Sequence, residues 1–122
     1  AGTATAVRRD TGEKTSLKLD SLSADAQVLL AAIQSDLLRK AEEFLASHTY
    51  TVDSYDDFKS KLENERGFLR AHWCEDAECE KQIKEETKAT TRCLPIDATE
   101  ELGSCVRCGK PSKHRWIFGL AY

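Results

Sequence analysis

The chain contains no run of apolar residues that approaches the length of a membrane span. Its first twenty residues also contain no apolar segment of the kind that forms a secretory signal peptide. We therefore expect a soluble, cytoplasmic protein with no membrane partner, whose cysteines stay reduced. An initiator methionine is missing as well, which indicates a fragment of a longer protein.

Charge of either sign is not in large excess, because the net charge is only −3 over 122 residues. This balance argues against a chain that binds nucleic acid over its whole surface. Basic residues do cluster locally, at Arg8-Arg9 and between Lys110 and Arg115, and we interpret both clusters as solvated faces. The length fits one domain with a modest core that a metal could reinforce.

Four of the five cysteines form two closely spaced pairs, Cys74-x4-Cys79 and Cys105-x2-Cys108. If the fold brings the pairs together, four thiolates make a tetrahedral cage suited to Zn²⁺. Gly109 follows the second pair, where a glycine lets the backbone turn and direct amides toward sulfur. Because four thiolates leave no open coordination position, we expect this metal to be structural.

The cysteines have competing explanations. Two disulfides would account for four of them, but they would leave the fifth unpaired in a chain without an export signal. The second pair could also serve thiol redox chemistry, although it precedes a strand and not the helix N-terminus that lowers a thiol pKa. Cys93 stands alone between the pairs, and we expect it to be a small buried hydrophobic residue.

The apolar pattern predicts alternating helices and strands. A stripe at three- and four-residue steps from Leu22 to Leu45 indicates a long amphipathic helix that fades near Ser47. Ser54 opens a capping-box sequence for a second helix, and Gly67 is a suitable left-handed C-cap. A third helix is expected to start near Cys79, and strands are expected at residues 4–9, 49–52, 68–73, 90–94 and 114–120.

The predicted order after the long helix is β-α-β-α-β, a zinc knuckle and a final β strand. Right-handed crossovers would place both short helices on one face of a small mixed sheet. We therefore predict an α+β fold, a two-layer α/β sandwich. The long helix would cover a sheet edge or bridge to a preceding domain.

Several long motifs occur in the order found in one enzyme family. They are Val52–Lys59, Ala71–Cys74, Glu78–Glu80, Ile83–Pro95, Cys105–Pro111 and the closing Ala121-Tyr122. Through these motifs, residues 21–122 resemble the zinc-binding C-terminal domain of prolyl-tRNA synthetase, of the type shared by archaea, eukaryotes and some bacteria. Residues 1–20 resemble, through Arg8–Lys14, the end of the family's anticodon-binding domain, with a flexible tail as the alternative.

The resemblance implies that the parent enzyme attaches proline to tRNA(Pro) with ATP and Mg²⁺, on a class II catalytic domain whose motifs are absent here. The isolated chain should therefore be inactive. The resemblance also implies a homodimeric parent whose catalytic and anticodon-binding domains are the partners of this one. It further implies a structural Zn²⁺ held by Cys74, Cys79, Cys105 and Cys108. The terminal Tyr122 is implied to fold toward the catalytic domain, with its carboxylate near the active site.

The chain departs from the family pattern at Glu75 and Arg107, neither of which is an expected ligand. We expect Arg107 to be an exposed, solubilising side chain. The alternative function is a free-standing zinc module that binds nucleic acid or protein.

Overall fold

The computed structural model of the chain describes residues 2–120. The chain separates into two compact units, Ala1–Phe44 and Leu45–Tyr122. Tyr122, to which the resemblance assigns a docking carboxylate, lies outside the described residues.

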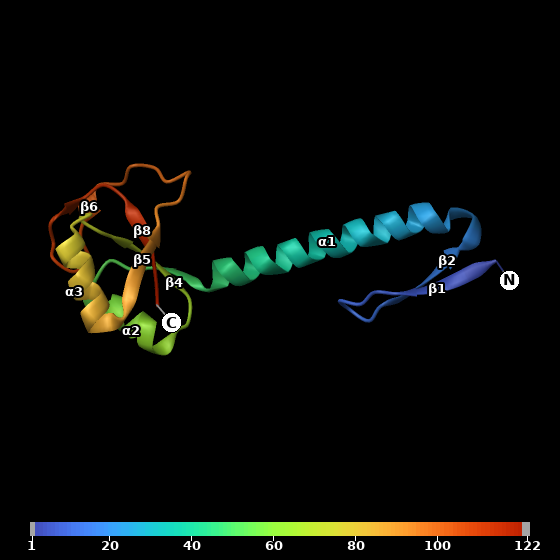
Figure 1. Ribbon diagram of the computed structural model, residues 1–122, viewed down its shortest axis with the longest axis horizontal. Helices are drawn as coiled ribbons and strands as arrows, with labels where there is room; N and C mark the ends of the chain where they lie inside the picture. Colours follow the sequence, from blue (N-terminus) through green and yellow to red (C-terminus); the bar gives the residue numbers. More distant parts are fainter. Residues whose placement is uncertain (1, 121–122) are drawn as a thin grey trace. The chain divides into compact units, whose positions relative to one another are not determined.

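The N-terminal unit contains a hairpin followed by most of a long helix (Figure 1). Its elements are β1 (Thr3–Val7), β2 (Lys14–Lys18), a 3₁₀ turn (Leu19–Ser21) and the greater part of α1 (Leu22–Ser47). β1 pairs antiparallel with β2 after a turn in which Gly12 adopts a φ of 76°, in the left-handed region that favours glycine. The sequence predicted the first strand, and it missed β2.

A buried arginine joins the hairpin to the helix. Nη2 of Arg8 donates to Oδ2 of Asp10 and to Oδ2 of Asp36, both at 2.7 Å. The guanidinium lowers the pKa of Asp10 by donating hydrogen bonds to its charged carboxylate. Arg8, interpreted from the sequence as part of a solvated basic face, is instead a structural residue within this unit.

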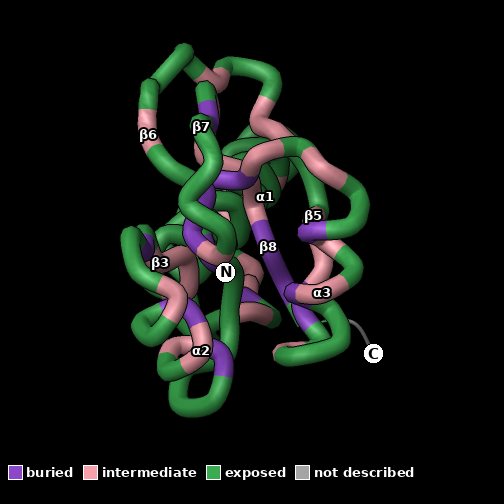
Figure 2. The backbone as a smooth tube through the Cα atoms, turned by 90° about the vertical axis from the view of Figure 1, so that its left-hand side faces the viewer, coloured by how far each residue is buried: buried purple, intermediate pink, exposed green. Residues whose placement is uncertain are grey.

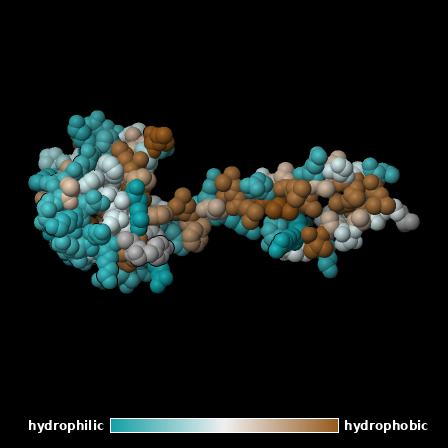
Figure 3. All heavy atoms as spheres, in the orientation of Figure 1, coloured by the Kyte–Doolittle hydropathy of each residue, from teal (hydrophilic) through white to brown (hydrophobic). Residues whose placement is uncertain are grey.

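The bounds of α1 agree with the apolar stripe, but the stripe is not covered. No described residue of α1 is buried, and Val28, Leu30 and Phe44 are 70%, 65% and 64% exposed. In Figure 3, brown apolar residues run along this helix. A two-stranded hairpin has too little surface to cover the apolar side of a helix of 26 residues.

The C-terminal unit follows the predicted order of elements. They are β3 (Thr49–Thr51), α2 (Tyr55–Asn64), β4 (Phe68–His72), α3 (Ala77–Thr87), β5 (Ala89–Cys93), β6 (Gly103–Ser104), β7 (Pro111–Ser112) and β8 (Arg115–Leu120). The main sheet has the order β3-β4-β8-β5. β3 runs parallel to β4, whereas β8 pairs antiparallel with both β4 and β5, so the sheet is mixed as predicted.

Both short helices pack on the same face of this sheet. Phe118 of β8 meets Phe58 of α2 edge to face at 5.2 Å, and Thr91, directly opposite Phe118 on β5, hydrogen-bonds Glu80 of α3. Opposed residues on neighbouring strands share a face, so the two helices form one layer over the sheet. The largest fully buried side chains lie between these layers: Val52, Phe58, Leu69, Ile83 and Phe118. Figure 2 shows buried stretches on β8 and beside α2 and α3.

One predicted cap is confirmed and another is wrong. The Ser54 hydroxyl accepts from the amide of Asp57 at 3.2 Å, as a helix N-cap does. Gly67 is not a left-handed cap, because α2 ends at Asn64 with an extended Glu65. A glycine is needed at position 67 for another reason, since a Cβ there would overlap the carbonyl of His48.

We expect Gly67→Ala to destabilise the zinc-loaded chain by about 2–4 kcal/mol, because neither backbone can move without disturbing β3 or β4. Urea unfolding followed by circular dichroism measures the change. Arg66→Ala, an exposed substitution one residue away, should stay within about 0.5 kcal/mol of the parent chain. Equal stability of both variants would contradict the overlap.

Candidate metal centre

The first cysteine pair lies where β4 passes into α3. Cys74 follows the strand, and the next residue, Glu75, adopts a φ of 59° that turns the chain sharply. Asp76 then caps α3 by accepting from the amide of Glu78 at 3.0 Å. Cys79 lies in the first turn of α3, where its side chain is buried. The turn and the cap together direct both sulfurs to the same side.

The second pair lies in a tight turn between β6 and β7. The amide of Cys105 donates to the carbonyl of Lys110 at 2.8 Å, and the amide of Gly109 donates to the carbonyl of Cys105 at 3.0 Å. Gly109 adopts a φ of 73°, in agreement with the role expected for it. The amide of Val106 donates to the carbonyl of His72 at 2.9 Å, which holds this turn against the end of β4.

The four sulfur atoms lie within 4.8 Å of one another. Sγ of Cys79 and Sγ of Cys105 are 3.7 Å apart, and Sγ of Cys74 and Sγ of Cys108 are 3.5 Å apart. A disulfide requires about 2.05 Å, so the described cysteines are free thiols. Sulfurs bound to one tetrahedral zinc at about 2.3 Å would be about 3.8 Å apart. The cluster could therefore hold a metal ion.

The thiols of this cluster have unequal acidity. Burial opposes ionisation of Cys105, but the backbone amides of Cys108, Arg107 and Cys74 donate to its sulfur and bring its pKa to about 7. Burial raises the pKa of Cys79 and of Cys74, and the neighbouring thiols raise both further. A divalent cation bound to the sulfurs would favour the ionised form of all these thiols, because metal coordination stabilises thiolates.

Charged side chains join the two cysteine segments around the cluster. Nζ of Lys110 lies 3.0 Å from Oδ2 of Asp76, and Nη2 of Arg107 lies 2.6 Å from Oε1 of Glu86 on α3. The Tyr55 hydroxyl of α2 donates to the same carboxylate at 2.6 Å. The hydrogen bonds from Arg107 and Tyr55 lower the pKa of Glu86. Arg107 is therefore an ion-paired residue and not merely a solubilising one.

A buried histidine attaches the β6–β7 hairpin to the main sheet. Nδ1 of His72 lies 3.1 Å from the hydroxyl of Ser112, which itself donates to the carbonyl of His114 at 3.0 Å. The single proton of the Ser112 hydroxyl is used in the bond to His114. The hydroxyl oxygen therefore accepts from Nδ1 of His72, which is the donor in this pair. A Cβ at Gly103 would overlap the ring of His72, so the hairpin approaches the ring closely. The sequence showed no sign of this pairing between residues forty positions apart.

Cys93 is exposed, so its expected burial is wrong. It lies at the end of β5, an edge strand, beyond a shift of register between Thr91 and Cys93. Free cysteines are usually buried, but the end of an irregular edge strand offers no covered position for this one. Cys93 is not a member of the four-sulfur cluster.

No helix among the described residues combines the length and the apolar composition needed to cross a membrane. A mixed sheet covered by two helices, with a four-cysteine cluster that joins two segments at its end, defines an α+β domain with a cluster that could hold a metal ion. Residues 55–122 match the sequence model of the family described as "Prolyl-tRNA synthetase, C-terminal". The chain belongs to this family, as its motifs indicated.

Curated relatives agree with this assignment. The chain is 45% identical over 115 residues to a proline–tRNA ligase of Amoebophilus asiaticus, covering 94% of this chain and 23% of the relative. It is 44% identical over 121 residues to that of Cytophaga hutchinsonii, covering 99% and 25%. It is 45% identical over 123 residues to that of Lachnospira eligens, covering 100% and 26%. The chain thus spans about a quarter of the length of these relatives.

The cluster geometry predicts that the reduced chain binds one Co²⁺ with the absorption bands of a tetrahedral four-thiolate site. Cys79→Ser should weaken this binding by more than the roughly 10–100-fold that the loss of an outer partner costs. Optical titration with Co²⁺ measures the affinity of the parent chain and that of the variant. Cys93→Ser is the matched control and should bind like the parent chain, and a spectrum with oxygen or nitrogen ligands in the parent would refute the four-sulfur assignment.

Proposed function

We propose that this chain is the C-terminal, zinc-binding structural domain of a proline–tRNA ligase, which attaches proline to tRNA(Pro) using ATP and Mg²⁺. The observation that carries the proposal is the convergence of four sulfurs from two distant segments within a chain of this family. In this proposal, residues 21–122 form the domain and residues 1–20 are the remnant of an anticodon-binding domain. The comparisons do not favour a free-standing zinc module, since the relatives are about four times longer.

Zinc suits this donor set better than other common metals. Thiolates are soft ligands, so Mg²⁺ and Ca²⁺, which prefer oxygen, are poor candidates. Zn²⁺ would be held by Cys74, Cys79, Cys105 and Cys108, with no position left for a substrate. Its chemistry there would be electrostatic, in that it would neutralise thiolates that burial otherwise disfavours.

The protein's own residues would position these ligands. Asp76 and Glu75 set the start of α3, while Gly109 sets the turn after Cys108. The ion pair between Arg107 and Glu86 holds the second cysteine turn against α3, and the hydrogen bond between His72 and Ser112 holds the hairpin against the sheet. Metal binding would then contribute folding free energy, about 10–16 kcal/mol for structural zinc in small domains.

The catalytic work would belong to the remainder of the enzyme. We infer a class II catalytic domain that forms prolyl-adenylate, an anticodon-binding domain before this chain, and assembly of the parent as a homodimer. The enzyme would work in the cytoplasm, where thiolates remain reduced. The carboxylate of Tyr122 would approach the catalytic site of the full enzyme. The archaeal and eukaryotic-type subclass stays a prediction.

We expect the purified chain to contain one zinc per chain, because its four thiolates form one closed set. Removal of the metal by a strong chelator under reducing conditions should abolish the cooperative unfolding of residues 45–122. Elemental analysis measures the zinc, and circular dichroism before and after chelation measures the fold. An unchanged spectrum and melting curve after full removal of the metal would contradict a structural role.

We expect no ATP–pyrophosphate exchange by the 122-residue chain, and deletion of Tyr122 from the full enzyme should slow aminoacylation. Both results follow if chemistry takes place on another domain that the terminal carboxylate approaches. Radiolabel exchange and tRNA charging measure the two rates. Exchange by the isolated chain would overturn the first expectation, and unchanged charging would overturn the second.

A further inference from the structure

Among the described residues, both helices that pack on the main sheet lie on the same face of it. Leu69, Phe118 and Thr91 form a row under the helices, so the residues that alternate with them point the other way. That second set includes Phe68 and Arg70 of β4 and Ile117 and Gly119 of β8. Phe68 is 39% exposed despite its apolar ring. We call this surface the open face.

Three arginines at or beside the open face lack an acidic partner. The four described strands of the main sheet contain no aspartate or glutamate, whereas β4, β5 and β8 each contain one arginine. Arg115 of β8 pairs with Asp53 at 2.6 Å and with Glu101 at 3.0 Å. Among the described residues, Arg66, Arg70 and Arg92 have no carboxylate partner, although the net charge of the chain is −3.

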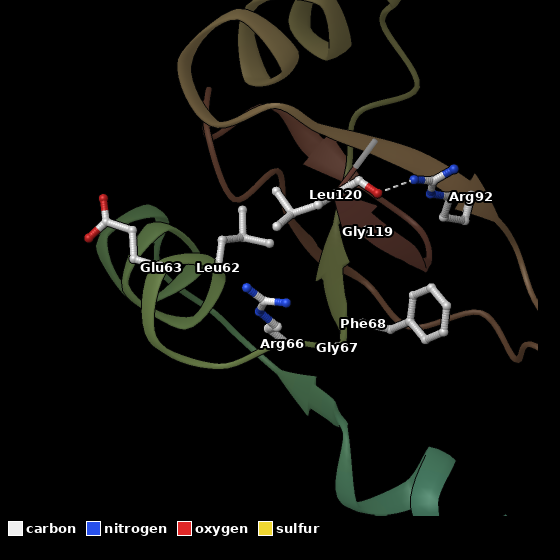
Figure 4. Close-up of a pocket in the computed structure, with 8 residues that line it drawn as sticks. All are labelled: Leu62, Glu63, Arg66, Gly67, Phe68, Arg92, Gly119 and Leu120. Atoms are coloured by element: carbon white, nitrogen blue, oxygen red, sulfur yellow. Dashed lines mark hydrogen bonds between the residues drawn. The ribbon is translucent and has the colours of Figure 1, made fainter. Parts of the chain in front are cut away.

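Phe68 and Arg92 meet over Gly119, and we call this pair of side chains the platform. A Cβ at position 119 would lie 3.2 Å from Nε of Arg92 and 3.2 Å from the ring of Phe68, so both side chains approach the bare glycine. The guanidinium of Arg92 donates to the carbonyl of Leu120, as the dashed line in Figure 4 shows. This bond fixes the guanidinium beside the exposed ring before any ligand arrives.

A hollow of about 620 Å³ adjoins the platform. Figure 4 shows Arg66 between the platform and the apolar side chains of Leu62 and Leu120, with the carboxylate of Glu63 turned away from Arg66. The hollow thus offers a cation, apolar walls and an aromatic ring together. That combination suits a planar apolar group attached to a negative charge.

We propose that the open face binds single-stranded RNA, with a base on the platform of Phe68 and Arg92 and phosphates at Arg66 and Arg70. Single-stranded RNA is recognised by stacking of bases on aromatic rings and guanidinium planes presented by sheets, with cations along the backbone. An acidic protein segment would satisfy the arginines, but it would make no use of the platform. The proposal goes beyond a structural role for the domain and does not depend on catalysis by the parent enzyme.

The experiment measures binding of a fluorescent single-stranded oligoadenylate to the zinc-loaded 122-residue chain by anisotropy, over a range of salt concentrations. With two arginines, Arg66 and Arg70, on phosphate, log Kd should change with log salt by a slope of about 1.4. Phe68→Leu should weaken binding about tenfold, because it keeps an apolar side chain but removes the ring. Arg70→Gln with Arg92→Gln should weaken binding about tenfold and reduce the slope to about 0.7.

The control is Lys81→Gln with Lys84→Gln, which makes the same change of charge on α3, away from the open face. It should bind RNA like the parent chain, and all variants should keep the zinc content and circular dichroism of the parent. Equal weakening by the control variant would overturn the proposal. So would tight binding of a heptaglutamate peptide that Phe68→Leu leaves unchanged, since that result would assign the face to an acidic protein segment.

Discussion

The structure of the C-terminal unit depends on the meeting of four sulfurs that come from two distant segments. Burial and neighbouring thiols raise the pKa values of Cys74 and Cys79, whereas backbone amides lower that of Cys105 to about 7. A divalent cation would stabilise all four thiolates at once. The start of α3 and the β6–β7 hairpin therefore have a reason to lie together that apolar contact alone does not supply.

The two ends of the main sheet have different chemistry. At the end where β4 finishes, backbone amides, His72 and the ion pair of Arg107 with Glu86 surround the cysteine cluster. At the end where β4 begins, Phe68, Arg66 and Arg92 surround an open hollow. The apolar contact of Phe58 with Phe118 lies between them and packs α2 against the sheet. In our proposals, a closed metal site would stabilise the domain, and the open face would bind RNA.

The sequence predicted most of the elements and all four members of the cluster, because both kinds of signal are local. Helical periodicity, the Ser54 cap and the cysteine spacing depend on residues a few positions apart. The strands β6 and β7 were missed because they have two residues each, and β2 was missed because Leu17 is its one apolar residue, so its form depends on pairing. Gly67 and Cys93 were misjudged because a neighbouring backbone and an irregular edge strand decide their surroundings.

The sequence by itself determined the α+β order, the family and the identity of the four clustered cysteines, since each of these rests on residue types at fixed spacing. Only the tertiary structure decided which distant side chains meet. The pairing of Arg107 with Glu86, the contact of His72 with Ser112 and the gathering of unpaired arginines beside Phe68 all depend on strand register. Register depends on how side chains pack between layers, a property of the whole fold that no short stretch of sequence encodes.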